Sequence, residues 1–414
     1  MIVATMPVRD IAPLTPAHRH AQTPPMGDDP PMYYEWWYFE VEFLDNLGRP
    51  FRIITSFHYP HAFDSRRVTA HEKFRNHATK YGDDPRHYAG LATYVVDMER
   101  SENVALFISR FRRNDIQNQV SLSRTGAVDL RFGASSFREI SAGKYQLTLD
   151  QTGRQQTAGR LPLHIRLVAT FEQNTPGFEP PGGVLLSAAG KQHHWACVMP
   201  NPVVRIDGVV VRRKSRREWQ SICEADENVG TLGGYHDHQW GDDLFWEQMT
   251  RWSWGRVPLT SSSASAKVVF FDVVPAHGAA QPDPVLVHVP AGAVMPQAMT
   301  PVAGHAPFVV SKIWDRIDLR DGCKLATRGK RIEYPRTLMI CARDAGGALR
   351  RFDLHHSNAD NVDVWPFYLR FVPEVSVGQT RVAAISEFMR ADRLNDPPTL
   401  RALTASNLIT TIAT

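Results

Sequence analysis

The sequence has little cysteine and no long apolar run. Its four cysteines, Cys197, Cys223, Cys323 and Cys341, do not have the paired short spacings of zinc sites or redox motifs, so we expect reduced thiols packed in a core. No stretch approaches the roughly 18 apolar residues of a membrane helix, and the N-terminus lacks the basic and apolar regions of a signal peptide. The sequence therefore predicts a cytoplasmic protein without an integral membrane segment.

An excess of charge of either sign is also missing. The 414 residues include 47 Lys and Arg against 43 Asp and Glu, a formal net charge of +4. Such a mixed surface argues against a nucleic acid or an anionic membrane as the partner. With 43% apolar residues, the chain can bury two cores of ordinary domain size. The oligomeric state is left open.

Helical periodicity is rare, whereas short β-like runs recur along the chain. Residues 1–30 are rich in proline and aperiodic, which predicts an extended arm. Beyond the arm, polar or glycine-containing breaks separate the apolar runs, and this pattern predicts an antiparallel sandwich or barrel rather than βαβ units. The main runs cover residues 92–96, 104–111, 145–149, 163–171, 193–200, 267–274, 285–289, 338–342 and 382–389.

The first strong strand signal covers residues 35–43, which end in an apolar and acidic alternation. That alternation is typical of a half-buried strand and places Trp37 inward. Glu35 falls on the same face, where it is either a functional carboxylate or the exposed start of the strand. A turn at residues 46–48 then predicts a hairpin with residues 51–57.

The densest chemistry lies in residues 235–241, Tyr-His-Asp-His-Gln-Trp-Gly. Successive side chains of a strand face opposite ways, so the carboxylate and the imidazoles cannot all line one cavity. The predicted faces hold Tyr235, Asp237 and Gln239 on one side, and His236, His238 and Trp240 on the other.

Asp237 could act as an acid if its face points into a dry pocket. Full burial raises a carboxyl pKa by up to 3 to 5 units, and roughly three units, about 4 kcal/mol, are needed for substantial protonation at neutral pH. The protonated form could protonate an alkene or donate to a carbonyl. Alternatively, Asp237 is ionised and bound to backbone amides or to Arg256.

The histidines raise the question of a metal. His236 and His238 have the spacing of a ligand pair on a strand, and His193 or His194 could add a third ligand. However, Asp237 faces away from both, and no further ligand spacing is present. We therefore expect a structural histidine pair, no metal and no cofactor.

Tryptophans flank the central motif and could stabilise a carbocation, each by on the order of 0.5 to 2 kcal/mol when desolvated. They could equally be core residues. Trp252, Trp254 and Arg256 would share one strand face, so part of this cluster should be visible from a cavity. The tryptophans concerned are Trp37, Trp195, Trp240, Trp252 and Trp254.

Four segments in order resemble the lipocalin-like superfamily of carotenoid 1,2-hydratases and AttH-like proteins. They are residues 35–38 (Glu-Trp-Trp-Tyr), 193–200, 234–241 and 252–256, and the late runs 366–371 and 386–388 are also similar. The resemblance implies an all-β fold of two consecutive calycin or lipocalin-like antiparallel β-barrels, with a ligand pocket in or between them. We place the N-terminal barrel at residues 31–260 and the C-terminal barrel at 261–414. The boundary falls near 255–268, where residues 261–266 form a low-complexity break.

The resemblance also implies chemistry. The superfamily includes hydratases of carotenoid and prenyl double bonds, Diels-Alder cyclases of polyenes, and members without an assigned reaction. The acid of the hydratases aligns with Asp237, although the histidine-rich motif is closer to the AttH-like and cyclase branch.

We expect a metal-independent hydratase or cyclase, of the lyase or isomerase class, in isoprenoid or specialised metabolism. It would act on an apolar polyene or prenyl substrate by acid-assisted hydration, isomerisation or cyclisation. The alternatives are a pericyclic cyclase that works by folding its substrate, and a non-catalytic lipid or polyene carrier. A carrier needs an apolar cavity but has no use for the polar strand 235–238, which favours an enzyme.

These arguments define two sets of candidate site residues. The candidate catalytic residues are Asp237, Tyr235 and His236. The candidate substrate-binding residues are Trp37, Glu35, Trp195, His193, Gln239, Trp252, Trp254 and Arg256.

Overall fold

The structure is a computed structural model of the whole chain. It describes residues 7–22, 33–60, 63, 67, 88–111, 119–154, 161–188, 190–215, 218–227, 231–260, 265–276, 278–318, 331–365, 367–396 and 410–411. Within these ranges the one complete α-helix is α3 (Phe245–Gln248), and the short 3-10 helices are η1 (Pro16–Arg19), η3 (Pro181–Gly183) and η4 (Ala391–Asn395). The prediction of an all-β protein is confirmed.

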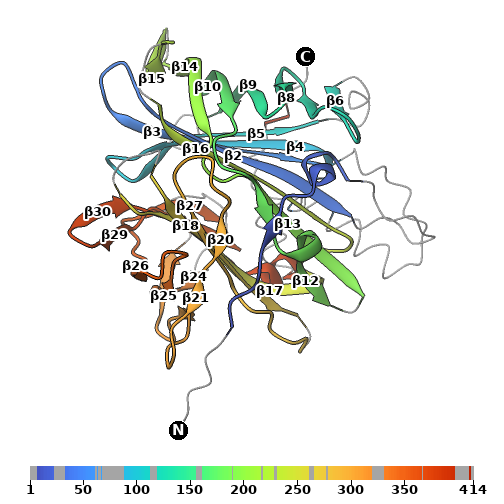
Figure 1. Cartoon of the computed structure of the whole chain (residues 1–414). Helices are drawn as coiled ribbons and strands as arrows, with labels where there is room; N and C mark the ends of the chain where they lie inside the picture. The colour runs from blue at the N-terminus through green and yellow to red at the C-terminus, as the bar shows by residue number, and fades with distance from the viewer. Residues whose placement is uncertain are drawn as a thin grey trace.

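A 10-stranded sheet, here called the central sheet, runs through the middle of the molecule (Figure 1). Among the described strands all pairs are antiparallel except β5 and β32, which run parallel. The strands of the central sheet lie in the order β1 (Ala12–Pro13), β11 (Phe178–Glu179), β13 (Lys191–Met199), β16 (Thr231–Gly241), β2 (Tyr34–Leu44), β3 (Pro50–His58), β4 (Gly90–Asp97), β5 (Glu102–Arg110) and β32 (Thr410–Thr411). In addition, β12 (Val184–Ala188) pairs with β13.

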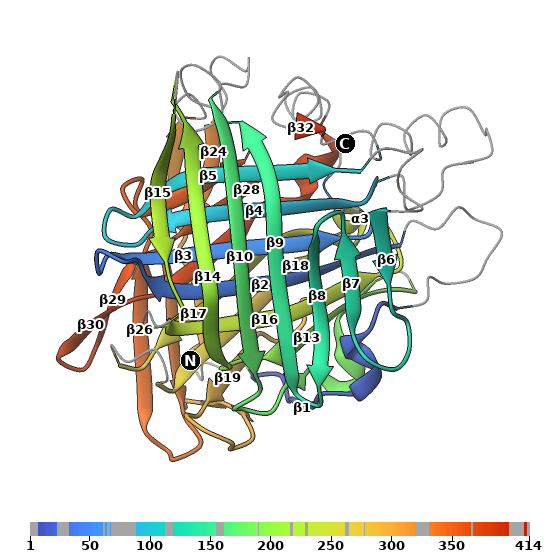
Figure 2. The same cartoon turned by 90° about the horizontal axis from the view of Figure 1, so that it is seen from above.

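Two seven-stranded sheets pack on opposite faces of the central sheet. The outer sheet has the order β15 (Trp219–Ala225), β14 (Val203–Lys214), β10 (Pro162–Glu172), β9 (Lys144–Arg154), β8 (Ser135–Ser141), β7 (Asp129–Phe132) and β6 (Val120–Leu122). The third sheet has the order β20 (Gln297–Ala298), β19 (Val285–Val289), β18 (Lys267–Pro275), β17 (Met249–Pro258), β31 (Ile385–Met389), β28 (Tyr368–Phe371) and β27 (Asn361–Trp365). In Figure 2 the outer-sheet strands run across those of the central sheet.

Smaller sheets cover the far side of the third sheet. Four strands form one of them: β21 (Thr300–Pro301), β25 (Thr337–Arg343), β22 (Phe308–Val310) and β26 (Leu349–His355). The remaining strands form two hairpins, β23 (Trp314–Asp318) with β24 (Arg331–Pro335) and β29 (Glu374–Val377) with β30 (Thr380–Ala383).

The central sheet is therefore buried on both faces. One face packs on the outer sheet through a core that includes Phe39, Phe137 and Leu167. The other face packs on the third sheet through a second core that includes Trp36 and Trp254. We call the space between the central and third sheets the inter-sheet layer.

Burial on both faces explains the sequence of β2. Residues 34–40 are all buried, because alternate side chains enter the two different cores. A continuous aromatic run suits such a strand better than a one-sided alternation does. The expected hairpin with residues 51–57 is confirmed, since β2 pairs with β3.

The rest of the chain bears on the remaining sequence predictions. Cys197, Cys223 and Cys341 are free and buried, as expected, and Cys323 lies outside the described residues. The arm joins the edge of the central sheet, where β1 pairs with β11. No helix in the described ranges has the length and apolarity needed to cross a membrane.

The chain leaves the central sheet at the end of β16 and enters the third sheet with β17, ahead of the predicted domain boundary. The low-complexity break at residues 261–266 lies between β17 and β18, which pair with each other, although residues 261–264 themselves lie outside the described part. The division into two barrels at residue 260 stays a prediction.

Candidate active site

The central motif lies on β16, between β13 and β2 in the middle of the central sheet. Asp237 is paired with Cys197 and Tyr38, and all three side chains face the inter-sheet layer. His236 and His238 face the other way, as the strand alternation predicts. At Gly234 a Cβ atom would lie 2.6 Å from Val204 Cγ2 and 2.9 Å from the Glu40 carbonyl oxygen, so glycine permits the close approach of neighbouring strands.

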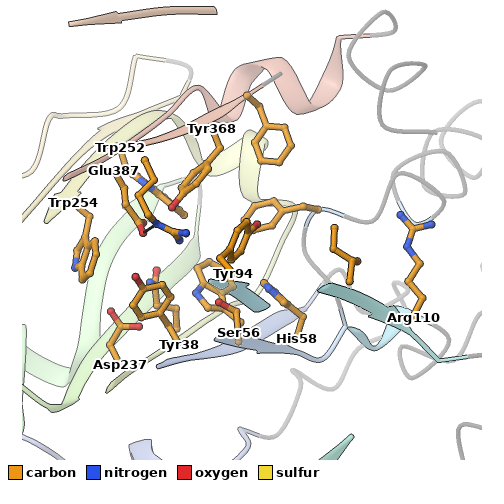
Figure 3. A pocket seen from close by; sticks show the side chains of 16 residues that line it. Tyr38, Ser56, His58, Tyr94, Arg110, Asp237, Trp252, Trp254, Tyr368 and Glu387 are labelled. Carbon is orange, nitrogen blue, oxygen red and sulfur yellow. Dashed lines mark hydrogen bonds and ion pairs between the residues drawn. The ribbon is translucent and has the colours of Figure 1, made fainter. Parts of the chain in front are cut away.

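A cavity in the inter-sheet layer brings Asp237 together with aromatic side chains of both sheets (Figure 3). It contains about 950 Å³ of empty space including its open mouth. The third sheet contributes Trp252, Trp254, Phe367, Tyr368, Arg370 and Glu387, and the rest of the wall comes from Trp36, Tyr38, Ser56, His58, Phe63, Tyr94, Ile108, Arg110, Asp237 and Gln239.

The two carboxyl oxygens of Asp237 have different surroundings. Oδ2 accepts hydrogen bonds from Trp195 Nε1 and from the Tyr235 hydroxyl, both at 3.0 Å. Oδ1 is buried and has no hydrogen-bond partner among the described residues. Burial raises the pKa of Asp237 to about 7, against the opposing effects of Trp195, Tyr235 and Gln239. A substantial fraction of this carboxyl is therefore protonated at neutral pH.

The tryptophans of β17 form much of the opposite wall. The ring of Trp254 lies 5.5 Å from that of Tyr38 in an edge-on arrangement, and Trp252 lies 6.1 Å from Trp36 across the layer. Trp254 Nε1 is buried and has no hydrogen-bond partner within the described part of the chain. The cavity thus offers aromatic faces and an indole donor close to the acid.

A buried ion pair lies in the same wall and was not among the sequence candidates. Arg370 Nε donates to Glu387 Oε1 at 2.9 Å, and the Arg370 guanidinium lies 5.0 Å from the ring centre of Tyr94. Burial raises the pKa of Glu387, with Arg370 opposing the rise. The late sequence runs 366–371 and 386–388 contain these residues. The alternation of side chains along these two strands was the signal that could have identified Arg370 and Glu387 as a pair.

Some candidates support the cavity from behind or lie outside it. Trp195 and Tyr235 do not line the cavity, but they hold Asp237 in place. His193 is hydrogen-bonded through Nδ1 to the Tyr34 hydroxyl at 2.6 Å, and burial lowers its pKa to about 3, so it is neutral. Arg256 donates to Glu40 and not to Asp237. It is therefore not the partner of an ionised Asp237 that the sequence analysis considered.

Two candidates, His236 and Trp37, lie on the opposite face of the central sheet. His236 stacks on Phe39 at 4.2 Å, and its pKa is lowered to about 3 by burial. Trp37 stacks on His238 at 4.9 Å. Because these rings belong to the core beneath the outer sheet, neither His236 nor Trp37 can reach a ligand beside Asp237.

Glu35 is neither the exposed start of a strand nor part of the cavity. It is fully buried, is hydrogen-bonded to His238 Nε2 at 2.8 Å, and accepts from the Tyr33 hydroxyl and the Gln22 amide. Burial raises its pKa well above the usual value. Glu35 therefore anchors the N-terminal arm to the central sheet.

The two histidines of the motif are occupied by separate partners. His236 Nδ1 is hydrogen-bonded to the Tyr38 carbonyl, and His238 uses both ring nitrogens, one on the His18 carbonyl and one on Glu35. No group of three or more His, Cys, Asp or Glu suited to a metal occurs among the described residues. A structural role for this pair fits these contacts, and the absence of a metal stays a prediction.

Comparison with known proteins agrees with the architecture. No family model matches the chain. Hydroxyneurosporene dehydrogenase of Chlorobaculum tepidum is 22% identical over 380 residues, 87% of this chain and 83% of that protein. An AttH-like protein of Nitrosomonas europaea superposes with a TM-score of 0.50 at 12% identity, covering 92% of this chain and 99% of the other. The chain has the AttH fold.

A second solved structure extends the comparison. CghA in complex with Sch210972 superposes with a TM-score of 0.52 at 14% identity, covering 92% of this chain and 98% of the other. The expected likeness to AttH-like proteins is thus confirmed at the level of the fold. At these identities the comparison concerns architecture, and the chemistry has to be argued from the cavity itself.

Proposed function

We propose that this protein is an enzyme that reshapes an apolar, unsaturated substrate by acid-assisted hydration, isomerisation or cyclisation, with Asp237 as the acid. One observation carries the proposal. A carboxyl group with a pKa near 7 stands in the wall of an aromatic cavity, and one of its oxygens has no protein partner among the described residues. A proton donor with a pKa near the working pH is what general acid catalysis requires.

The geometry of Asp237 suits proton donation through Oδ1. Trp195 and Tyr235 bind Oδ2 and fix the carboxyl plane. When Oδ1 gives its proton to an alkene carbon, the C–H bond forms with the alkene electron pair and a carbocation results. The same two donors then stabilise the carboxylate. The cation can take up water, lose a neighbouring proton or react with a second double bond.

The aromatic wall supports the cationic step. Trp36, Trp252 and Trp254 present rings to the cavity, and each ring face contributes on the order of 0.5 to 2 kcal/mol to a desolvated cation. The names of two similar proteins, one a hydroxyneurosporene dehydrogenase and the other crystallised with Sch210972, are compatible with an organic small molecule as the substrate.

A pericyclic cyclase is the second candidate, favoured by the buried indole N–H of Trp254. This donor has no partner among the described residues and could hold a carbonyl of a polarised diene or dienophile. In that mechanism Asp237 would also act as a hydrogen-bond donor, and the rate would come chiefly from holding the substrate in its reactive conformation.

The first experiment identifies the substrate and tests the acid. Small molecules extracted from the purified protein are identified by mass spectrometry and then used for turnover. Asp237→Asn should lose on the order of 10²- to 10⁴-fold in rate while the protein stays folded and is no less stable than the wild type at neutral pH. Asp272→Asn is the matched control, because Asp272 is also a buried aspartate with a raised pKa but does not line the cavity.

Reaction in D₂O distinguishes the two candidate mechanisms, alkene protonation and pericyclic cyclisation. Alkene protonation places deuterium on a product carbon, whereas a pericyclic cyclisation leaves the carbon-bound hydrogens unchanged. A fully active, fully stable Asp237→Asn variant would remove Asp237 from the mechanism. If the extracted molecule is bound and returned unchanged under all conditions, the protein is a carrier and the proposal fails.

A further inference from the structure

A second pocket lies in the inter-sheet layer, toward the β2–β3 turn and the β29–β30 hairpin. It contains about 1070 Å³ of empty space including its mouth, and no described residue lines both this pocket and the Asp237 cavity. Arg256 stands at the inner end, with its guanidinium 4.5 Å from the ring centre of Tyr235. We call this space the basic pocket.

Buried cations outnumber buried carboxylates around the basic pocket. Arg52, Arg256 and Lys267 are 3%, 4% and 5% exposed. They are accompanied by two acidic side chains, Glu40 and Glu42. Arg381 of β30 lies exposed at the rim, where it forms an ion pair with Glu374 at 3.4 Å. A buried cation without a carboxylate beside it is costly, and the cost is relieved either by loss of its proton or by binding of an anion.

The carboxylates occupy only part of the available donors. Arg52 Nη2 donates to Glu42 at 2.8 Å, and Glu40 accepts from Arg256 and from the Tyr38 hydroxyl. Arg52 Nη1 and Arg256 Nε are buried without a hydrogen-bond partner in the described part of the chain. These two donors belong to residues of two different sheets, and both residues line the same pocket.

Lys267 adds a third cation without a direct partner. No hydrogen bond or ion pair of its ammonium group occurs within the described residues, although the side chain lines the pocket. Burial and the nearby Arg256 lower the pKa of Lys267 to about 7, while Glu42 and Glu40 oppose the change. The remaining neighbour with an electrostatic effect is Cys197, whose thiol pKa is raised by burial and which stays neutral.

We propose that the basic pocket binds an oxyanion, a carboxylate or a tetrahedral anion of the phosphate and sulfate type, between Arg52, Arg256 and Lys267. A guanidinium with free N–H groups recognises two oxygens of such an anion, and an ammonium group supplies a point charge beside it. The site is separate from the Asp237 cavity and does not depend on the reaction proposed there.

Sulfate and acetate are the probes, because neither changes its charge between pH 6 and 8.5. Binding is measured by titration calorimetry in a chloride buffer of matched ionic strength, which removes general salt effects. We expect saturable binding of at least one probe. Tighter sulfate binding would indicate a tetrahedral anion, and tighter acetate binding would indicate an organic acid.

Variants of Lys267 provide the decisive comparison. Lys267→Met should weaken the Kd at least tenfold. Wild-type affinity should fall as the pH rises from 6 to 8.5, because the ammonium group loses its proton, whereas Lys267→Arg should bind without that pH dependence. Lys191→Met removes an exposed lysine of β13 and should leave the Kd unchanged. Asp237→Asn should also bind normally, so the two proposals fail independently.

Several results would overturn the proposal. Binding heats that do not saturate and are equal in the wild type and in Lys267→Met would show a general salt effect. An unchanged Kd in Lys267→Met would exclude the lysine. If that variant does not fold, Arg381→Gln at the exposed rim decides the question together with the wild-type pH series. If Arg381→Gln binds the probes with unaltered affinity and the wild-type affinity does not change with pH, the proposed anion site is refuted.

Discussion

The raised pKa of Asp237 makes a quantitative prediction about stability. The folded carboxyl has a pKa of about 7 against a usual value of 3.8. Each pKa unit corresponds to 1.36 kcal/mol, so the difference amounts to about 4 kcal/mol. Between these values the folded state binds more protons than the unfolded state, and the free energy of unfolding must fall as the pH rises. Asp237 therefore destabilises the fold progressively from about pH 4 to about pH 7.

Asp237→Asn removes this titration while keeping the shape of the side chain. The free energy of unfolding of the variant minus that of the wild type should rise by about 4 kcal/mol between pH 4 and pH 8. Urea unfolding at five pH values measures the difference. Histidines such as His236, with pKa lowered to about 3, give slopes of the opposite sign, but both proteins share these slopes and they cancel.

Asp272→Asn serves as a positive control for the sign. The pKa of Asp272 is raised by burial to about 6. The free energy of unfolding of Asp272→Asn minus that of the wild type should therefore rise by about 3 kcal/mol and level off one pH unit earlier than for Asp237→Asn. A flat Asp237→Asn difference beside a rising Asp272→Asn difference would show that Asp237 is ionised in the folded protein. The general acid proposed above would then lack its proton.

Three further predictions address the cavity, the strand packing and the question of a metal. Trp254→Phe should lower kcat/KM about 2- to 30-fold, because the ring face and indole N–H contribute about 0.5 to 2 kcal/mol, and an unchanged value would remove Trp254 from the site. Gly234→Ala should lower the free energy of unfolding by about 1 to 3 kcal/mol through the contacts with Val204 and Glu40, whereas Gly346→Ala, whose nearest neighbour is at 3.4 Å, should change it by less than about 1 kcal/mol. Elemental analysis should find no stoichiometric zinc or iron, and chelation should leave turnover unchanged; one metal per chain would contradict this expectation.

The sequence was most informative where a strand is regular and its two faces have different tasks. On β16 the period of two correctly separates Asp237 from His236 and His238. The same rule failed to select the cavity side of β2. It identified Trp37 as an inward residue, but in a sheet covered on both faces Trp36 and Tyr38 are equally inward, and they are the ones that line the cavity.

Contacts between residues distant in sequence could not be predicted from local patterns. Arg256 binds Glu40 across 216 positions, so the sequence alone could not show that this arginine already has a carboxylate partner. Glu35 likewise depends on His238, 203 positions away. In both cases the partner was itself within a recognised strand, and only the packing of the sheets shows which carboxylate meets which cation.

The chemistry proposed for Asp237 depends on both halves of the chain. Desolvation is the largest cause of its raised pKa, and much of the cover over its face of the central sheet comes from the third sheet, through Trp252, Trp254 and Tyr368. Without that sheet, water would reach the carboxyl and its pKa would return toward 3.8, leaving almost no proton to donate at neutral pH. The acid and the apolar cavity are thus created by the same packing, so any change that loosens the inter-sheet layer should reduce the protonated fraction of Asp237 along with substrate binding.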